Sequence, residues 1–278
     1  MSSLKDKVVV ITGASSGIGK ALADVALHRN AKVAVCARNI EKLKNVFGNS
    51  PDKNLIFFQA DVSKEADCKA FVDFIIAEWD RIDVLINNAG TSMRALFEDA
   101  NLSVIRDLID VNFWGTVYST KYALPSIRTN NGVVVGVSSV AGYRGLPGRT
   151  GYSASKFAMQ GFLEALRTEL LHTGTHIMWV CPGFTASNIR NVALNATGTQ
   201  QSETPLEEDK LMTAEECAIN ILNAVEKRKR TIIMTGQGKL TVLINKLFPG
   251  LADKLVYKHF LKEPGSPLLK YHPTANKK

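Results

Sequence analysis

Short apolar runs alternate with amphipathic helical segments along the first 235 residues of this chain of 278 residues. The first run is VVVIT at residues 8–12 and the last is IIM at residues 232–234. Such runs, rich in β-branched residues and apolar on both faces, are typical of strands buried in a parallel sheet. Helical segments between them supply the crossovers that a parallel sheet requires. The sequence therefore predicts an α/β fold with a doubly wound, seven-stranded parallel sheet.

The expected elements cover most of the chain, and two further segments differ from them. We expect strands at 8–12, 33–37, 55–60, 83–86, 133–137, 176–180 and 232–234, and helices at about 18–30, 40–47, 65–79, 103–126, 152–172 and from 213 to the basic run 227–230. Residues 184–212 are polar, which predicts either a lid or a segment without regular structure. We expect residues 1–235 to form one domain and residues 236–278 to form a helical extension.

Positive charge is concentrated at the C-terminal end of the chain. The formal net charge is +8, of which residues 227–278 contribute +10 and residues 1–226 contribute −2. The predicted domain is therefore nearly neutral. Because no nucleic-acid-binding motif accompanies the basic segment, we expect no nucleic-acid partner.

A glycine-rich turn joins the first strand to the first helix, with the sequence TGASSGIG at residues 12–19. Its glycines permit a tight turn, close approach of a ligand to the backbone, and close helix–strand packing. The free N–H groups and the positive dipole end of the helix favour a pyrophosphate there. We expect a dinucleotide in a Rossmann fold, bound by Gly13, Ser15, Ser16, Gly17, Ile18 and Gly19.

The end of the second strand indicates which dinucleotide binds. A carboxylate at this place would bind the ribose 2′-hydroxyl of NAD, but here Arg38 follows the strand. A planar guanidinium pairs well with a 2′-phosphate. We therefore predict NADP(H) as the cofactor, and we expect Asp61 and Val62, after the third strand, to meet its adenine.

Three residues are candidates for proton transfer. Tyr152 and Lys156 stand four residues apart at the start of a helix, so their side chains share one face. An ammonium group beside a phenol lowers the phenol pKa, which is ordinarily about 10. The pair predicts a proton donor and acceptor that works near neutral pH. Ser139, at the end of a strand, is placed to hold a substrate oxygen beside Tyr152.

With these motifs, the further positions Asn87 to Gly90, Asn112 and Pro182-Gly183 make the chain resemble the short-chain dehydrogenase/reductase family in its single-domain branch. The resemblance extends from about residue 5 to residue 235. The segment 181–189 is similar to members that reduce lipid, steroid and retinoid carbonyls. The resemblance implies NADP(H)-dependent hydride transfer to or from a hydrophobic ketone, aldehyde or secondary alcohol.

The resemblance also implies individual roles. Tyr152 is expected to be the general acid and base, and Lys156 to bind the nicotinamide ribose and lower the pKa of Tyr152. Ser139 is expected to orient the substrate, and Asn112 to hold a water of the proton relay. The other family positions are expected in the cofactor site: Asn88, Ala89 and Gly90 in its wall, and Pro182, Gly183 and either Thr185 or Ser187 beside the nicotinamide.

The substrate pocket is less sharply defined by the sequence. By resemblance, its walls come from segments that hold Met93, Ser139, Tyr143, Leu146 and Phe184, which predict a largely apolar pocket. Arginines in or near the same segments either meet an anionic end of a substrate or face water: Arg94, Arg144, Arg149 and Arg190.

Residues 239–262 of the basic extension carry apolar side chains at helical spacing, interrupted at Pro249-Gly250, with lysines at other positions. Two interpretations stay open. The helices lie on an anionic membrane surface, or they pack over the pocket or on a partner subunit. The family resemblance implies a homodimer or homotetramer, paired through the helices at 103–126 and 152–172.

The remaining features concern location and alternative functions. We expect a cytoplasmic protein, with or without peripheral membrane contact, because no secretory signal or membrane span is readable and the four cysteines are widely spaced. The spacing of the five histidines predicts no metal site. The competing function is a nucleotide-binding sensor or scaffold with a membrane- or partner-binding tail. Such a protein has no need for Ser139, Tyr152 and Lys156 together.

Overall fold

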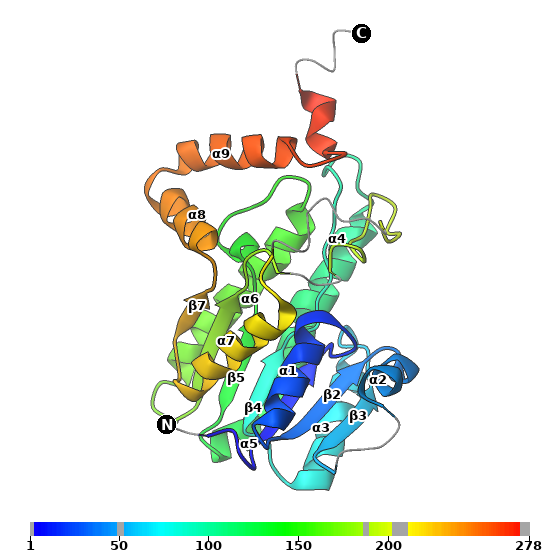
Figure 1. The fold of residues 1–278 in the computed structure, drawn as a ribbon, viewed down its shortest axis with the longest axis vertical. Coiled ribbons are helices and arrows are strands. Elements are labelled where there is room, and N and C mark those ends of the chain that lie inside the picture. The colour runs from blue at the N-terminus through cyan, green and yellow to red at the C-terminus, as the bar shows by residue number, and fades with distance from the viewer. Residues whose placement is uncertain (1–2, 49–52, 186–188, 202–210, 273–278) are drawn as a thin grey trace.

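The structure is a computed structural model that describes residues 3–48, 53–185, 189–201 and 211–272 (Figure 1). Its centre is one seven-stranded parallel sheet with the strand order β3-β2-β1-β4-β5-β6-β7. The order reverses between β1 and β4, and ligands of doubly wound sheets bind at the carboxyl ends of the strands beside such a switch point. The predicted Rossmann-type fold is confirmed.

The strands and helices follow the predicted alternation closely. The strands are β1 (Val8–Thr12), β2 (Lys32–Ala37), β3 (Leu55–Gln59), β4 (Val84–Asn87), β5 (Val133–Val137), β6 (His176–Cys181) and β7 (Thr231–Ile233). The helices between them are α1 (Gly17–His28), α2 (Ile40–Phe47), α3 (Glu65–Trp79), α4 (Leu102–Ile109), α5 (Gly115–Thr129), α6 (Thr150–Glu169) and α7 (Ala214–Glu226).

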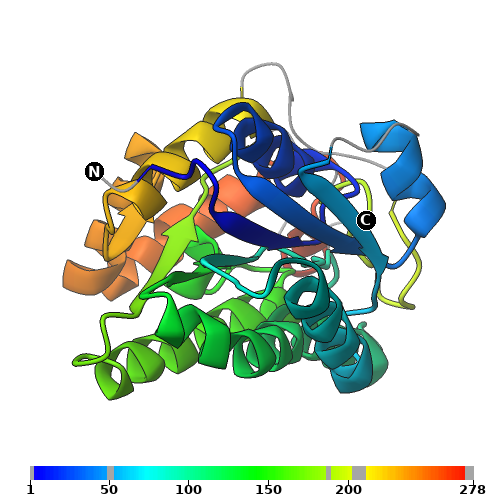
Figure 2. The ribbon, with the colours of Figure 1, turned by 90° about the horizontal axis from the view of Figure 1, so that it is seen from below.

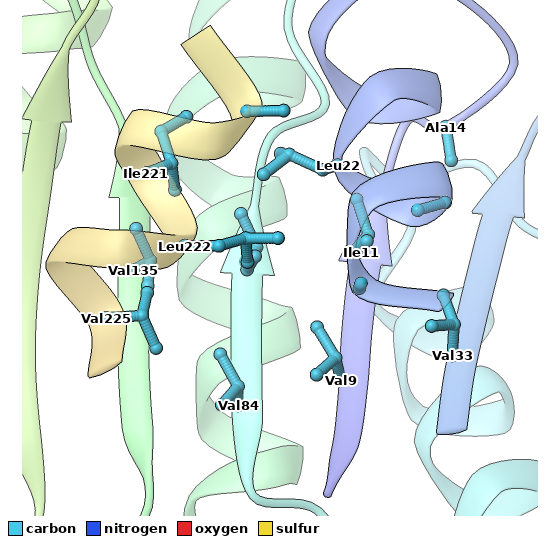
Figure 3. Close-up of a cluster of buried hydrophobic side chains, with 14 of the residues drawn as sticks. Val9, Ile11, Ala14, Leu22, Val33, Val84, Val135, Ile221, Leu222 and Val225 are labelled. Carbon is cyan, nitrogen blue, oxygen red and sulfur yellow. The ribbon is translucent and has the colours of Figure 1, made fainter. Parts of the chain in front are cut away.

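Helices cover both faces of the sheet, with α1 and α7 on one face and α3, α5 and α6 on the other (Figure 2). Successive residues of each strand point to opposite faces. In β1, Val9 and Ile11 therefore join the core beneath α1 and α7, whereas Val8 and Val10 join the opposite core. Figure 3 shows the first of these cores between the sheet, α1 and α7. The four cysteines are free and buried.

The prediction of one continuous helix at 103–126 is wrong in one respect. The structure has two helices, α4 and α5, joined by a π-helical segment at Asp110–Trp114. A π segment adds one residue to a helical turn and thereby reorients the side chains around it, often at a functional site. Here the segment contains Asn112, whose side chain is fully buried.

The C-terminal extension is helical, as predicted. It consists of α8 (Gly236–Leu247), α9 (Pro249–Leu261) and a 3-10 helix at Pro267–Tyr271. These elements lie at the opposite end of the molecule from the N-terminus (Figure 1). Among the described residues, no helix combines the length and the apolar character needed to cross a bilayer.

The extension packs on the body of the protein through one face of α9. Val256 and Phe260 form a small apolar core with Leu96 and Leu268. Polar ties add to this core. Arg144 binds Asp253 at 2.5 Å and Asn245 at 3.0 Å, and Lys270 binds Glu98 and Asp99 at 2.6 Å each. Of the two open interpretations of the extension, packing over the body of the protein is thus observed.

Candidate active site

The glycine-rich turn after β1 lies unusually close to two other backbone segments, the start of α1 and the residues after β4. Gly13 has φ +72°, and a Cβ added there would lie 2.7 Å from the Cα of Ala89. A Cβ on Gly19 would lie 2.3 Å from the carbonyl oxygen of Gly13. Only glycine fits these two positions. The first turn of α1 therefore opens directly above the carboxyl ends of β1 and β4, which exposes its N–H groups as a phosphate site.

Asn88 and Thr12 fasten this turn to the end of β4. The Asn88 side-chain amide donates to the carbonyl oxygens of Thr12 and Gly13, both at 3.0 Å. The Thr12 hydroxyl accepts from the backbone N–H groups of Asn88 and Ala89, both at 3.1 Å. The turn is thus held in shape by the protein itself. Thr12 opens the glycine-rich motif but was not among the predicted site residues, although its place directly before Gly13 was a usable signal.

A cavity of about 1000 Å³ extends from this turn across the ends of the strands. This volume is at the upper end of the range for small-molecule and cofactor sites. The predicted cofactor residues that line it are Gly13, Ser15, Ser16, Gly17, Ile18, Gly19, Arg38, Asp61, Val62, Asn88, Ala89, Gly90, Tyr152, Lys156, Pro182, Gly183 and Thr185. The alternative nicotinamide contact, Ser187, lies outside the described residues. The tight glycine turn and the size of the cavity fit a dinucleotide.

At the β2 end of this cavity the side chains carry positive charge. Arg38 is exposed and directly follows β2, and Lys42, one turn into α2, also lines the cavity. Asp61 binds the hydroxyl and the N–H of Ser63 at 2.7 and 3.1 Å, which holds its carboxylate near the end of β3. Lys42 was not among the predicted residues.

Ser139, Tyr152 and Lys156 come together at the other end of the cavity. Tyr152 and Lys156 lie on consecutive turns of α6, and the Lys156 Nζ lies 5.8 Å from the centre of the Tyr152 ring. Ser139, directly beyond β5, forms a side-chain hydrogen bond with Tyr152. Lys156 is buried and donates to the carbonyl oxygen of Val137 at 2.8 Å. The predicted triad is therefore assembled in space.

The protonation of Tyr152 differs from the sequence-based expectation. Burial raises the pKa of Tyr152, and a hydrogen bond from Ser139 and the positive charges of Arg149 and Arg190 lower it only in part. The Lys156 ammonium group donates its hydrogen bond to the carbonyl oxygen of Val137 and not to the phenol. In this structure the phenol is thus protonated at neutral pH, which is the form that donates a proton.

Lys156 gives the cofactor-free protein a measurable pH dependence. Burial lowers the pKa of Lys156 from 10.5 to about 8. Between these two values the unfolded chain binds more protons than the folded one, so the free energy of unfolding rises with pH, by up to about 3 kcal/mol. The buried cysteines, whose pKa values are raised, act in the opposite direction above pH 9, so the test is the difference between two proteins. We expect the free energy of urea unfolding of the wild type, relative to that of Lys156→Met, to rise with pH over this range. Parallel profiles for the two proteins would contradict the lowered pKa.

Asn112 lies in the π-helical segment, and three hydrogen bonds hold its side chain to residues outside that segment. Its Oδ1 accepts from the N–H of Thr91 at 2.8 Å, and its Nδ2 donates to the Thr91 carbonyl oxygen at 3.0 Å and to Ser155 Oγ at 2.8 Å. The side chain thus joins the segment after β4 to α6, beside Gly90 and Lys156. Its predicted water-holding role stays a prediction, since Asn112 is not among the described residues that line the cavity.

A second cavity of about 300 Å³ continues from the triad toward the C-terminal extension. The two cavities share Ser139, Leu146, Pro182, Gly183 and Phe184. The remaining walls of the second cavity come mainly from α8 and α9 and are largely apolar, with residues Val140, Thr235, Gln237, Gly238, Thr241, Leu255, Val256, His259 and Phe260. Leu146 and Phe184, two of the predicted substrate residues, thus lie at an apolar opening beside Ser139.

Two predicted substrate residues lie elsewhere. Neither Met93 nor Tyr143 is among the described residues that line the two cavities. Met93 is fully buried and packs with Leu108 behind Tyr152. The Tyr143 hydroxyl accepts a hydrogen bond from the indole N–H of Trp179 at 2.9 Å. Packing and hydrogen bonding within the protein thus engage both side chains, and their contact with substrate stays a prediction.

The cavity walls contributed by the C-terminal extension were not assigned from the sequence. Leu255, Val256 and Phe260 line the smaller cavity, and Glu263 lines the larger one. The helical spacing of the apolar residues at 239–262 was the available signal for the first three. Glu263 carried no such signal.

Comparison with known proteins agrees with this geometry. The sequence profile described as short chain dehydrogenase matches residues 7–197. The 11-beta-hydroxysteroid dehydrogenase 1A of Arabidopsis thaliana is 35% identical over 266 residues, which cover 90% of this chain and 74% of that protein. The similarity to both extends well beyond the glycine-rich turn.

Solved structures share the fold. A short-chain dehydrogenase/reductase from Burkholderia phymatum, in complex with NAD, has a TM-score of 0.80 and 21% identity, with 90% of this chain and 96% of that chain covered. A short-chain dehydrogenase from Burkholderia cenocepacia J2315, in complex with NADP, has a TM-score of 0.78 and 21% identity, with 92% and 99% covered. Fold, sequence profile and relatives together show that the chain belongs to the short-chain dehydrogenase/reductase family of oxidoreductases.

Proposed function

We propose that this protein is an NADP(H)-dependent oxidoreductase that transfers hydride between the nicotinamide and a hydrophobic ketone, aldehyde or secondary alcohol. One observation carries the proposal: the cofactor-sized cavity and the apolar cavity meet at Ser139, beside Tyr152. An apolar compound in the smaller cavity can therefore place an oxygen at the triad. The assembled triad also favours an enzyme over a nucleotide-binding sensor, which has no use for a proton donor at this place.

The roles of the triad follow from the positions of its polar atoms. When bound, the cofactor supplies or accepts the hydride. The Ser139 hydroxyl holds the substrate oxygen, and the Tyr152 hydroxyl gives that oxygen a proton during reduction or removes one during oxidation. Lys156 would hold the nicotinamide ribose, and its positive charge would oppose the rise in the pKa of Tyr152. Asn112 fixes the backbone of Thr91 and the Ser155 hydroxyl beside this group.

Preference for NADP(H) rests on Arg38 and Lys42. The cationic side chains stand at the end of β2, where an NAD-specific site would need a carboxylate. We expect Arg38→Ala to weaken NADPH binding about tenfold, because a partly exposed charge-assisted pair contributes about 1.5 kcal/mol. NADH binding should change little. Thermal stabilisation by each nucleotide measures this change, and Lys42→Ala should weaken NADPH binding in the same direction. Stronger stabilisation of the wild type by NADH would contradict the preference.

The substrate class is proposed from the apolar walls of the smaller cavity and from a relative. The Arabidopsis relative is named as a hydroxysteroid dehydrogenase, which supports a large apolar alcohol or ketone. The test is a panel of aliphatic, aromatic and polycyclic carbonyl compounds, followed by the absorbance of NADPH. Turnover of apolar members, rising with apolar surface, supports the proposal. Turnover confined to small polar carbonyls would contradict it.

We further propose a cytoplasmic protein that contacts a membrane through residues 236–278. The outer surfaces of α8 and α9 support this contact. Six large apolar side chains are 46–60% exposed there, namely Leu240, Leu243, Leu247, Phe248, Leu251 and Leu255. Five lysines surround them: Lys239, Lys246, Lys254, Lys258 and Lys262. Apolar side chains flanked by lysines are suited to an anionic lipid surface.

A homodimer or homotetramer is proposed from the surface of α5 and α6. Trp114, directly before α5, and Phe157, on α6, are 40% and 46% exposed. Aromatic side chains are enriched in interfaces between subunits. Their exposure therefore supports association of copies through these two helices.

A further inference from the structure

Two arginines converge on a single carboxylate of the C-terminal extension, which stands in the wall of the larger cavity. Arg149 Nη2 donates to both oxygens of Glu263, at 3.0 Å each. Arg94 Nε lies 3.6 Å from the same carboxylate. The side chains of Arg94, Arg149 and Glu263 are 11%, 14% and 4% exposed, respectively. Arg94 follows β4, Arg149 precedes α6, and Glu263 follows α9. Three segments that are distant in the sequence therefore meet in one shielded ion cluster.

The cluster adjoins the triad. Arg149 and Glu263 both line the larger cavity. Arg149 is the residue directly before α6, three positions ahead of Tyr152, and its charge acts on the Tyr152 hydroxyl. A substrate whose oxygen lies at Tyr152 therefore has this cluster close by.

Other groups of the protein engage both arginines, although Arg94 Nε forms no hydrogen bond. Arg149 Nη1 donates to the carbonyl oxygen of Pro147 at 3.3 Å, and its guanidinium lies 4.6 Å from the ring centre of Phe260. Arg94 Nη2 donates to the carbonyl oxygen of Pro264. Neither arginine thus faces water or waits for an anionic ligand, although the sequence left both alternatives open. The Glu263 carboxylate cancels one of the two positive charges at this place in the cavity wall.

We propose that Glu263 is a specificity-determining residue that makes this active site select substrates without a negative charge. The inference deepens the proposed function and rests on it for the reaction itself. By binding Arg149 and Arg94, the carboxylate occupies an arginine pair that would otherwise form an anion site. The C-terminal extension thus sets the charge of the cavity wall in addition to covering it.

The charge of Glu263 can be removed with little change in shape. Glu263→Gln keeps the length of the side chain and one acceptor for Arg149, but leaves two arginine charges uncompensated beside the cavity. These charges should attract an anionic group. We expect the affinity for an anion, relative to an uncharged compound of equal length, to rise about tenfold or more. Glu263→Asp retains the charge and should retain the selectivity of the wild type.

Calorimetric titration of the full chain with NADPH present measures this preference without any need for turnover. The probes are decanoate and decan-1-ol, which have the same chain length and differ in charge. We expect the wild type to bind decan-1-ol more tightly, and Glu263→Gln to shift the ratio of the two dissociation constants toward decanoate by about tenfold or more. The double variant Glu263→Gln/Arg149→Gln should lose this gain.

Asp253→Asn is the matched control. It removes the charge that ties the same extension to Arg144, but Asp253 is exposed and is not among the described residues that line the cavities. An unchanged ratio in Glu263→Gln, or an equal shift in Asp253→Asn, would reduce Glu263 to a structural tie and overturn the inference. So would a wild type that binds neither compound. A wild type that prefers decan-1-ol but turns over no carbonyl would contradict only the proposed function.

Discussion

Replacing Tyr152 with phenylalanine should leave NADPH binding intact and reduce carbonyl turnover about a thousandfold or more. The ring fills the same space, so α6 and the neighbouring Lys156 keep their places. What is lost is the hydroxyl that forms a hydrogen bond with Ser139 and can exchange a proton with the substrate oxygen. Single-turnover rates with saturating NADPH and the best substrate of the carbonyl panel measure the loss.

Tyr143→Phe provides the matched control. Tyr143 follows the same strand as Ser139, and its hydroxyl accepts a hydrogen bond from Trp179. Tyr143 is not among the described residues that line the two cavities. Its replacement removes a tyrosine hydroxyl from the same part of the molecule and should cost only a modest amount of stability. Retained turnover in Tyr152→Phe, or equal losses in both variants, would rule out Tyr152 as the general acid.

Vesicle binding is the second prediction with a large expected effect. We expect the full chain to sediment with vesicles that contain anionic phospholipid, and Leu243→Glu/Leu247→Glu to stay in the supernatant. Burial of one leucine contributes about 2 kcal/mol, so the double change should lower partitioning by at least a hundredfold. Because each lysine near an anionic surface adds about 1 kcal/mol, binding should weaken with salt and on neutral vesicles.

The control for the vesicle experiment is Leu171→Glu. Leu171 is 68% exposed but follows α6, away from the C-terminal extension. The substitution Leu171→Glu should leave sedimentation with the vesicles unchanged. Activity on a water-soluble carbonyl should be the same for all three proteins, since Leu243 and Leu247 are not among the described residues that line the cavities. A wild type that remains in the supernatant would remove the proposed membrane contact.

The sheet and the triad could be predicted because their signals are local. Apolar runs of β-branched residues fix β1 to β7, and the spacing of Tyr152 and Lys156 fixes a shared helix face. The π-helical segment at Asp110–Trp114 could not be predicted in this way. Its extra residue changes the hydrogen-bond pattern of a helix but leaves the apolar periodicity on both sides almost unaltered.

The unpredicted parts of the site depend on pairings between distant segments. Arg149 and Glu263 stand 114 positions apart, and each is unremarkable in its own segment. Met93 and Tyr143 were placed in the pocket because their segments border it, yet the direction of each side chain depends on partners that no local pattern reveals. The pKa of Tyr152 likewise depends on burial and on the orientation of Lys156.

The fastening of the glycine-rich turn to Asn88 has a consequence for the order of folding. The hydrogen bonds from Asn88 to Thr12 and Gly13 join positions 75 and 76 residues apart. The nucleotide cradle therefore cannot exist until β4 has aligned beside β1, however early α1 forms. A ligand that binds only the completed cradle stabilises the folded chain by mass action. Recovery of nucleotide binding during refolding would accordingly mark the moment at which the centre of the sheet closes.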